Sequence, residues 1–257
     1  MKIPFQTGRR KKAPCIPKGM RIYAVGDIHG RADLLARLLT RISAHFASRP
    51  VSNPVRIFLG DYIDRGPASR EVLDLLIAEA RSCRSIFLKG NHESYLTEFT
   101  SNPLILDHWQ HLGGLETLMS YGITPTLNAN AGTQVELAAA LRRVLPENHR
   151  DFLGNLETSF TCGDFFFVHA GVRPGIPLSK QREEDLLWIR YDFLLHEEPF
   201  EKIIVHGHTP VTGPEVHPNR INIDTGAYAS GRLTCLVLES DQISFIWAAA
   251  RRWDSNN

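Results

Sequence analysis

The residues of this chain that could do chemistry are acids, histidines and an asparagine that closely follow short apolar runs. Each run has about the length and the β-branched or aromatic content of a buried strand. The side chains that follow offer carboxylate, imidazole and amide oxygen, the ligand set expected for Mn, Fe or Zn and not for a thiolate-bound structural metal. The runs and the residues after them are RIYAV with GDIHG, VRIFL with GDYIDRG, SIFLK with GNHE, FFFV with HAG, and KIIV with HGHT.

Together these side chains predict a two-metal site for phosphate chemistry. Two metal ions about 3.5–4 Å apart can share a bridging carboxylate and a bridging water, which becomes a nucleophile near neutral pH. A phosphate ester needs that nucleophile, an acid for its leaving group and cations for its oxygens. Arg65 and Arg190 could supply the cations, because guanidinium groups match phosphate oxygens bidentately. The candidate site residues are Asp27, His29, Asp61, Asp64, Asn91, His92, His169 and His208.

Each of these residues also has an ordinary structural interpretation. A lone aspartate after a strand is usually a turn residue or a helix cap. A lone histidine is more often hydrogen-bonded within the structure than a metal ligand. Those roles do not require the order D-x-H, D-x-x-D-R-G, N-H-E, H-A-G and G-H-T, each behind a strand. The complete set therefore favours one functional site.

The elements that must position these residues alternate between strands and helices. One apolar stripe indicates a helix over 31–47, and another indicates a helix over 69–81. Strands that alternate with helices imply parallel sheets, which bind ligands at the carboxyl ends of their strands. The segments RINID, LTCLVLE and QISFIWA predict further strands without long helices. The predicted fold is α/β, with two sheets packed face to face and helices outside.

We expect a single domain over residues 21–250. A basic, flexible tail over residues 1–20 precedes it and carries the run Arg9–Lys12. An insertion at about 95–160 looks helical, with breaks at Pro103 and at several glycines, and it contains no cluster of chemistry-bearing residues. We expect this insertion to lie over or beside the site and to select the substrate.

Three motifs, GDIHG (26–30), GDYIDRG (60–66) and GNHE (90–93), resemble the signature motifs of PPP-type serine/threonine phosphatases, and the HGHTP and DTGA segments resemble the bacterial and phage type of that family. That family lies within the calcineurin-like metallophosphoesterase superfamily. HAG (169–171) and HGHT (206–209) are similar to its two later histidine motifs. The resemblance covers most of the chain and implies the αββα sandwich of that superfamily.

The resemblance implies a role for each residue that matches a motif. Two divalent or trivalent metal ions, with Mn expected ahead of Fe or Zn, would be held by ligands that share Asp61 as a bridge. His92 would protonate the leaving group, and Asp64 would keep its imidazole charged. The implied metal ligands are Asp27, His29, Asp61, Asn91, His169 and His208. The implied catalytic residues are His92, Asp64, Arg65 and Arg190, and the implied substrate-binding residues are Arg65, Asn91, Arg190 and Tyr228.

The implied activity is dephosphorylation of phosphoserine or phosphothreonine in proteins, by direct attack of a metal-bridging hydroxide. Asp64 favours this branch, because diadenosine tetraphosphatases tend to replace the residue before the motif arginine. GNHE in place of GNHD points the same way. Two alternatives stay open, namely a symmetrical dinucleoside tetraphosphate hydrolase and a degenerate, non-catalytic phospho-binding module.

The bulk composition limits the expected partners. Lys and Arg total 29 against 28 Asp and Glu, which favours neither a nucleic-acid partner nor a membrane partner. The four cysteines form no CxxC pair, which indicates a reducing compartment and no disulfide framework. No apolar stretch reaches the ~20 residues that span a bilayer, and we expect no export because the first residues lack the apolar run of a secretory signal. We expect a cytoplasmic monomer that acts on a phosphoprotein or phosphopeptide.

Other patterns carry less weight. Asp224-Thr225-Gly226 is similar to the aspartic-protease triplet, but we interpret it as a turn at the end of a strand. His206, two residues before His208, is expected to have a structural role. GxGxxG and P-loop patterns are absent, so nucleotide binding by those routes is not supported.

Overall fold

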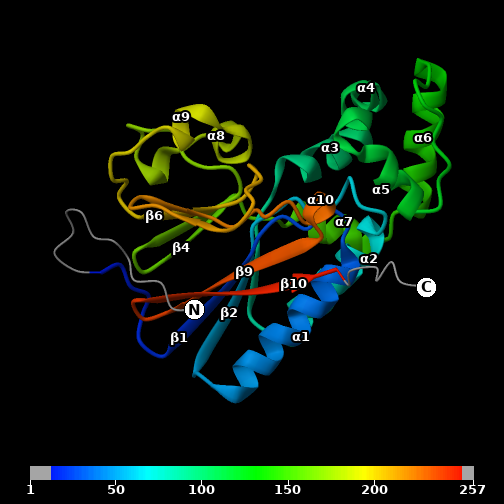
Figure 1. Cartoon of the computed structure of the whole chain (residues 1–257). Helices are drawn as coiled ribbons and strands as arrows, with labels where there is room; N and C mark the ends of the chain where they lie inside the picture. The colour runs from blue at the N-terminus through cyan, green and yellow to red at the C-terminus, as the bar shows by residue number, and fades with distance from the viewer. Residues whose placement is uncertain (1–12, 251–257) are drawn as a thin grey trace, which may run out of the picture.

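Within residues 13–250, the part of the chain that this computed structural model describes, two five-stranded sheets lie face to face (Figure 1). The strands are β1 (Met20–Val25), β2 (Asn53–Phe58), β3 (Ser85–Phe87), β4 (Ser159–Cys162), β5 (Phe165–Val168), β6 (Ile203–His206), β7 (Glu215–Val216), β8 (Arg220–Asn222), β9 (Arg232–Glu239) and β10 (Gln242–Ala249). The first sheet has the order β10-β9-β1-β2-β3, with β1, β2 and β3 parallel. The second has the order β4-β5-β6-β8-β7, with β5, β6 and β8 parallel. The parallel strands of both sheets deliver the predicted site loops.

The space between the sheets is filled by aliphatic and aromatic side chains from both of them. Ile22 and Ile57 of the first sheet pack in the same fully buried cluster as Phe167 and Val205 of the second. Burial of such side chains stabilises the fold by roughly 1.5–3 kcal/mol each. This shared interior holds the two sheets in one unit and fixes their strand ends relative to one another.

Helices cover the outer faces of both sheets, as the sequence predicted. On the first sheet lie α1 (Ala32–Ser48) and α2 (Ser69–Ser82), and on the second lie α8 (Glu183–Trp188) and α9 (Tyr191–Leu194). None of the described helices is long and apolar enough to cross a membrane. The apolar stripe predicted for the first helix is buried in full and consists of Leu34, Leu35, Leu38, Leu39 and Ile42.

The insertion predicted at about 95–160 is helical up to Gly154. Its helices gather beside α2 at one end of the molecule (Figure 1). Gly113 breaks the run with a φ of 96°, in the left-handed region that favours glycine. The elements are α3 (Asn91–Phe99), η1 (Pro103–Ile105), α4 (Leu106–Trp109), η2 (Gln110–Leu112), α5 (Gly114–Ser120), α6 (Ala131–Val144) and α7 (Glu147–Gly154).

The predicted flexible tail is corrected for its second half. The backbone N–H of Ile16 donates to Ser240 O at 3.0 Å, and that of Asp164 donates to Cys15 O at 2.9 Å. The side chain of Ile16 is 3% exposed. The chain before β1 is therefore held against both sheets by backbone hydrogen bonds and burial. Residues 1–12, with the run Arg9–Lys12, lie outside the described residues.

Candidate metal centre

The predicted metal ligands converge where parallel strands of the two sheets end. The loop after β1 supplies two of them, and those after β2, β3, β5 and β6 supply one each. All six are at most 5% exposed, so the site is enclosed by protein. The six are Asp27, His29, Asp61, Asn91, His169 and His208.

The backbone at this site is unusual. Seven non-glycine residues of the described chain have a positive φ, a sparsely populated region for residues with a Cβ atom. Five of the seven belong to the predicted site, namely His29, Asp61, Asp64, Arg65 and His208. Strain of this kind persists where surrounding structure over-determines it, and it is commonest at functional sites.

Asp61 lies between two groups of possible metal ligands. Its Oδ2 is 3.4 Å from His29 Nε2, and its Oδ1 is 3.4 Å from His169 Nε2. Asp61, His29 and His92 form one group, and Asp61, His169 and His208 form the other, with the ligand atoms of each within 4.8 Å of one another. One carboxylate with one oxygen toward each group is the arrangement that a bridging ligand requires.

The histidine rings are oriented by backbone carbonyls. His29 Nδ1 donates to Ile63 O at 2.8 Å, and His169 Nδ1 donates to Leu59 O at 2.9 Å. In the neutral rings this leaves Nε2 as the atom with a free lone pair, and such outer partners are typical of metal-binding histidines. Burial lowers the pKa of His29 to about 3 and that of His208 to about 2, so both rings are neutral at physiological pH.

Two buried polar atoms at the site have no hydrogen-bond partner among the described residues. They are Asp27 Oδ1 and His208 Nε2. Orphaned buried polar atoms are rare and costly. Burial, together with the charges of Asp224 and Asp61, raises the pKa of Asp27 well above its usual range. Crowded buried acids and unpaired ligand atoms both fit a site that holds metal cations.

His92 and Asp64 form the predicted pair, with His92 Nδ1 2.7 Å from Asp64 Oδ2. Burial works against the imidazolium, but the charges of Asp61 and Asp64 raise the pKa of His92 above its ordinary value. The other ring nitrogen, Nε2, is 3.4 Å from Arg65 Nη2 and 3.7 Å from Asp61 Oδ2. The ring can therefore carry a proton toward the centre of the site.

The insertion holds Asp64 in place, which sequence reasoning missed. Trp109 Nε1 donates to Asp64 Oδ2 at 2.7 Å, and Thr117 Oγ1 donates to Asp64 Oδ1 at 2.5 Å. The backbone N–H of Asp64 bonds to Thr117 Oγ1 and Ser69 Oγ. No motif marks Trp109 or Thr117, so no local signal could have found them.

Glu93 was predicted only as a motif letter, yet it joins two of the site loops. Its Oε2 accepts from the backbone N–H of Gly90 at 2.9 Å and of Asp61 at 3.0 Å. Its Oε1 accepts from the backbone N–H of Tyr62 at 2.8 Å. The carboxylate thus fixes the loop after β2 against the start of α3.

Asp224 belongs to the buried acid cluster, which the turn interpretation did not anticipate. Its Oδ1 does accept from the backbone N–H of Gly226 at 2.8 Å, as a turn residue would. It is also 2% exposed, and its charge contributes to the raised pKa of Asp27. The signal was available, because Asp224 follows the parallel strand β8 as the predicted ligands follow theirs.

The remaining predicted residues lie around the centre. Arg65 is half-buried, with its guanidinium carbon 4.6 Å from the centroid of the Tyr228 ring, and Tyr228 lies in α10 (Ala227–Ser230), 5.4 Å from the His29 ring. Arg190 is exposed between α8 and α9. Burial first, and the charge of Arg190 to a smaller degree, lowers the pKa of His169 and His208. The structure brings all of these residues to one place, and their roles stay predictions.

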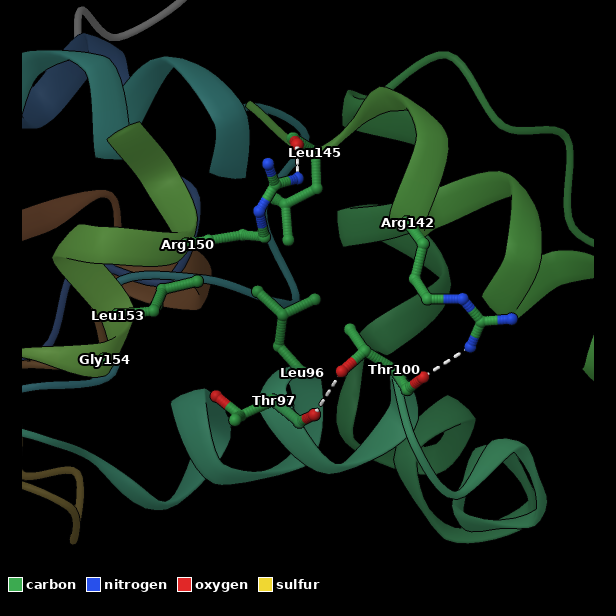
Figure 2. Close-up of a pocket in the computed structure, with 8 residues that line it drawn as sticks. All are labelled: Leu96, Thr97, Thr100, Arg142, Leu145, Arg150, Leu153 and Gly154. Carbon is green, nitrogen blue, oxygen red and sulfur yellow. Dashed lines mark hydrogen bonds between the residues drawn. The ribbon is translucent and has the colours of Figure 1, made fainter. Parts of the chain in front are cut away.

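A separate pocket of about 530 Å³ is lined by residues of α3, α6 and α7 and the residues next to them (Figure 2). Arg142 and Arg150 stand on opposite sides of it, and each donates to a backbone carbonyl, of Thr100 and of Leu145. None of the predicted site residues lines this pocket. Its lining residues are Leu96, Thr97, Thr100, Arg142, Leu145, Arg150, Leu153 and Gly154.

Comparison with known proteins gives consistent matches over nearly the whole described chain. A family model described as calcineurin-like phosphoesterase matches residues 20–241. A curated relative from Halalkalibacterium halodurans, an asymmetrical bis(5'-nucleosyl)-tetraphosphatase PrpE, is 26% identical over 252 residues, which cover 91% of this chain and 95% of the relative. The protein of the same name from Bacillus velezensis is 28% identical over 234 residues, which cover 82% of this chain and 86% of the relative.

Solved structures match the fold at low sequence identity. A crystal structure with the provisional description of diadenosine tetraphosphatase has a TM-score of 0.57 at 18% identity and covers 95% of this chain and 100% of its own. A cold-active protein tyrosine phosphatase has a TM-score of 0.57 at 17% identity, covering 94% and 85%. A protein serine/threonine phosphatase from Saccharomyces cerevisiae has a TM-score of 0.51 at 13% identity, covering 92% and 82%.

Proposed function

Because this chain belongs to the calcineurin-like phosphoesterase family, we propose that it hydrolyses dinucleoside tetraphosphates asymmetrically, to a nucleoside monophosphate and a nucleoside triphosphate. The observation that carries the chemistry is Asp61, with one carboxylate oxygen toward each of two buried ligand groups. The names of the curated relatives support the substrate class and the asymmetry of cleavage. This proposal replaces the predicted protein phosphatase as the leading assignment, and it differs in symmetry from the alternative drawn from the sequence.

The residues that would hold the metal ions are Asp61, the three histidines His29, His169 and His208 from the two groups around it, and the neighbouring Asp27 and Asn91. Asp27, His29 and Asp61 would hold one ion, and Asp61 would share the other with Asn91, His169 and His208. When bound, such a metal pair lowers the pKa of a water between the ions and neutralises phosphate oxygens. We expect Mn as the native metal, ahead of Fe or Zn.

The other residues of the chain would bind the polyphosphate and deliver a proton. Arg65 and Arg190 are the cations available for phosphate oxygens beside the ligand groups, and Asn91 could donate from its amide. His92 Nε2 would give its proton to the departing oxygen, while Asp64 holds Nδ1. A departing nucleotide phosphate is less basic than an alkoxide, so its dependence on this proton would be weaker.

A side-by-side assay tests the proposal. Chelator-stripped protein with Mn restored would be given diadenosine tetraphosphate, a phosphothreonine peptide and para-nitrophenyl phosphate, with nucleotide products separated by anion-exchange chromatography. We expect the dinucleotide to have a kcat/KM at least about tenfold above the peptide, with AMP and ATP as products. The variant Asp61→Asn should lose turnover of all three substrates. Two molecules of ADP would contradict the asymmetry, and a leading peptide would contradict the substrate class.

A serine/threonine protein phosphatase remains the second candidate function. The observation that favours it is the 2.7 Å contact between His92 Nδ1 and Asp64 Oδ2, since an alkoxide leaving group needs a strongly held acid. The motif resemblance points the same way. A non-catalytic phospho-binding module is disfavoured because every predicted ligand position in this sequence carries a residue that can bind a metal ion. Failure of all three substrates with Mn, Fe and Zn would restore that alternative.

A further inference from the structure

Trp188 presents an exposed aromatic ring at the edge of the metal centre. It is the last residue of α8, and its side chain is 40% exposed. Its ring centroid lies 6.4 Å from that of His208 and 5.8 Å from that of Tyr95. The rings of His208 and Tyr95 are nearly perpendicular to the indole plane, with interplanar angles of 82° and 79°, so neither ring stacks on it in parallel. A large apolar ring beside a polar centre is available for a flat partner.

A second exposed ring lies at the other end of the ligand set. Tyr228 is 39% exposed and lies 5.4 Å from the ring of His29, whereas Trp188 neighbours His208. His29 and His208 belong to different ligand groups around Asp61. The two aromatic side chains therefore neighbour different ligand groups of the centre.

An arginine lies beside the Tyr228 ring in space, and another lies close to Trp188 in the sequence. Arg65 lies 4.6 Å from the centroid of Tyr228, and Arg190 follows Trp188 by two residues. Aromatic side chains combined with positive charges are the usual means of binding single-stranded nucleic acids without base specificity, because every base has a π-face and every linkage a phosphate, and the same contacts suit a dinucleoside polyphosphate. This combination matches a molecule with a charged middle and flat, apolar ends.

We propose that the indole of Trp188 is the stacking platform for one nucleobase of the dinucleoside tetraphosphate. The tetraphosphate would then extend from Trp188 across the two ligand groups toward Tyr228. This inference rests on the proposed function, and it deepens it by naming the residue that distinguishes a dinucleotide from a substrate without a base. Stacking tolerates any base, so adenine and guanine dinucleotides should both be substrates.

The test compares Trp188→Ala and Trp188→Phe with a matched control. Trp247→Ala removes a tryptophan of similar exposure, 43%, which lies on β10 under Arg232 and outside the proposed binding residues. For Trp188→Ala we expect the loss of kcat/KM on diadenosine tetraphosphate to be at least tenfold greater than the loss on para-nitrophenyl phosphate, and to arise mainly from KM. Trp188→Phe should retain most activity on the dinucleotide, and Trp247→Ala should match the wild type on both substrates.

Three results would overturn the inference. Equal losses on both substrates, or reduced metal content in Trp188→Ala, would show that the indole only supports His208. A selective loss on the phosphothreonine peptide would show that the ring serves a peptide. If Trp188→Ala does not fold, quenching of tryptophan fluorescence by AMP in the wild type but not in Trp188→Phe supports the stacking, and equal quenching contradicts it. If the wild-type protein hydrolyses the peptide but not the dinucleotide, the proposed function itself is contradicted. This result comes from the wild-type assay alone, before any variant is made.

Discussion

The carboxylate of Asp61 directs one oxygen to His29 and the other to His169, and its backbone N–H is held by Glu93. The spacing of GDYIDRG, with the family resemblance, predicted the bridging position. It could not predict the role of Glu93, because the three backbone N–H groups that donate to its carboxylate come from the fold and correspond to no sequence pattern. On sequence grounds alone Glu93, as GNHE in place of GNHD, favours a protein substrate. In the structure its carboxylate instead joins the loop after β2 to the start of α3.

Asp64 shows a similar limit at the scale of single residues. The sequence predicted its pairing with His92, and the 2.7 Å contact between them agrees with that prediction. Its other partners, Trp109 and Thr117, lie 45 and 53 residues further along the chain. Since this network fixes Asp64 in the fold, its presence does not by itself indicate a protein substrate, and the names of the relatives do not support the branch that Asp64 favoured in the sequence.

The variant Asp64→Asn should move the basic limb of the pH–rate profile. The charges of Asp61 and Asp64 raise the pKa of His92, so the imidazolium survives to higher pH than an ordinary histidine. Without the Asp64 charge that pKa falls, and the protonated form is lost at lower pH. The measurement is kcat/KM on phenyl phosphate, a poor leaving group, from about pH 5 to pH 9.

The control for this variant is Asp241→Asn, an exposed carboxylate in the turn between β9 and β10. It should leave the profile unchanged. A basic limb that stays in place in Asp64→Asn would show that His92 does not act as the acid.

At the scale of elements, the ends of the strands carry the site, and glycines there serve two different needs. Gly60 has a φ of 101°, which a side chain would strain. Gly207 has no such conformation, but a Cβ atom on it would meet Asp27 Oδ1. Glycine permits both a tight turn and a close approach of the backbone to other groups. At Gly207 the close approach is to the carboxylate of Asp27, which is a predicted metal ligand.

We predict that Gly207→Ala loses metal affinity by about 10–100-fold, because the added methyl group displaces the Asp27 carboxylate. The measurement is a Mn titration of the chelator-stripped protein, with activity recovered against free Mn. Gly213→Ala is the matched control, since its Cβ would meet nothing within 4 Å. Equal Mn affinity in both variants would remove Asp27 from the ligand set.

Long periodic elements were predictable, whereas some of the short ones were not. The stripes for α1 and α2 and the strands β8, β9 and β10 were all found from the sequence. The strand β7 has two residues, and α4 has four, too few for any period to be read. The insertion was correctly predicted as helical. Selection of substrate by it stays a prediction, while its contacts with Asp64 show that it also supports the centre.

At the scale of the whole molecule, the two packed sheets were predicted, but the order of their strands was not. The strand β1 lies between β2 and β9, and it pairs Arg21 with Glu239, 218 residues away. No local pattern encodes a pairing at that separation. The substrate class could not be predicted from the sequence for a different reason, because one metal centre on one fold serves many phosphate esters.

The metal centre should also contribute to stability. Metal ions that bind only the folded chain stabilise it by about 2.7 kcal/mol at 100 times the Kd, which for a domain of this size corresponds to a rise in Tm of about 5–10 °C. We therefore expect Mn to raise the Tm of chelator-stripped protein by this amount, measured by calorimetry. Asp61→Asn should abolish the shift. A wild-type Tm that does not respond to Mn would argue against a built metal site.

The pairing of β1 with β9 also determines when the enzyme can form during its synthesis. Until the ribosome has made β9, one edge of β1 has no neighbour, and open strand edges are sites for association with other chains. At usual translation rates the stretch from β2 to β9 takes on the order of 10 s. His208 also emerges late, so the full set of predicted metal ligands is complete only near the end of synthesis, and until β9 has been made the edge of β1 stays open to association with other chains.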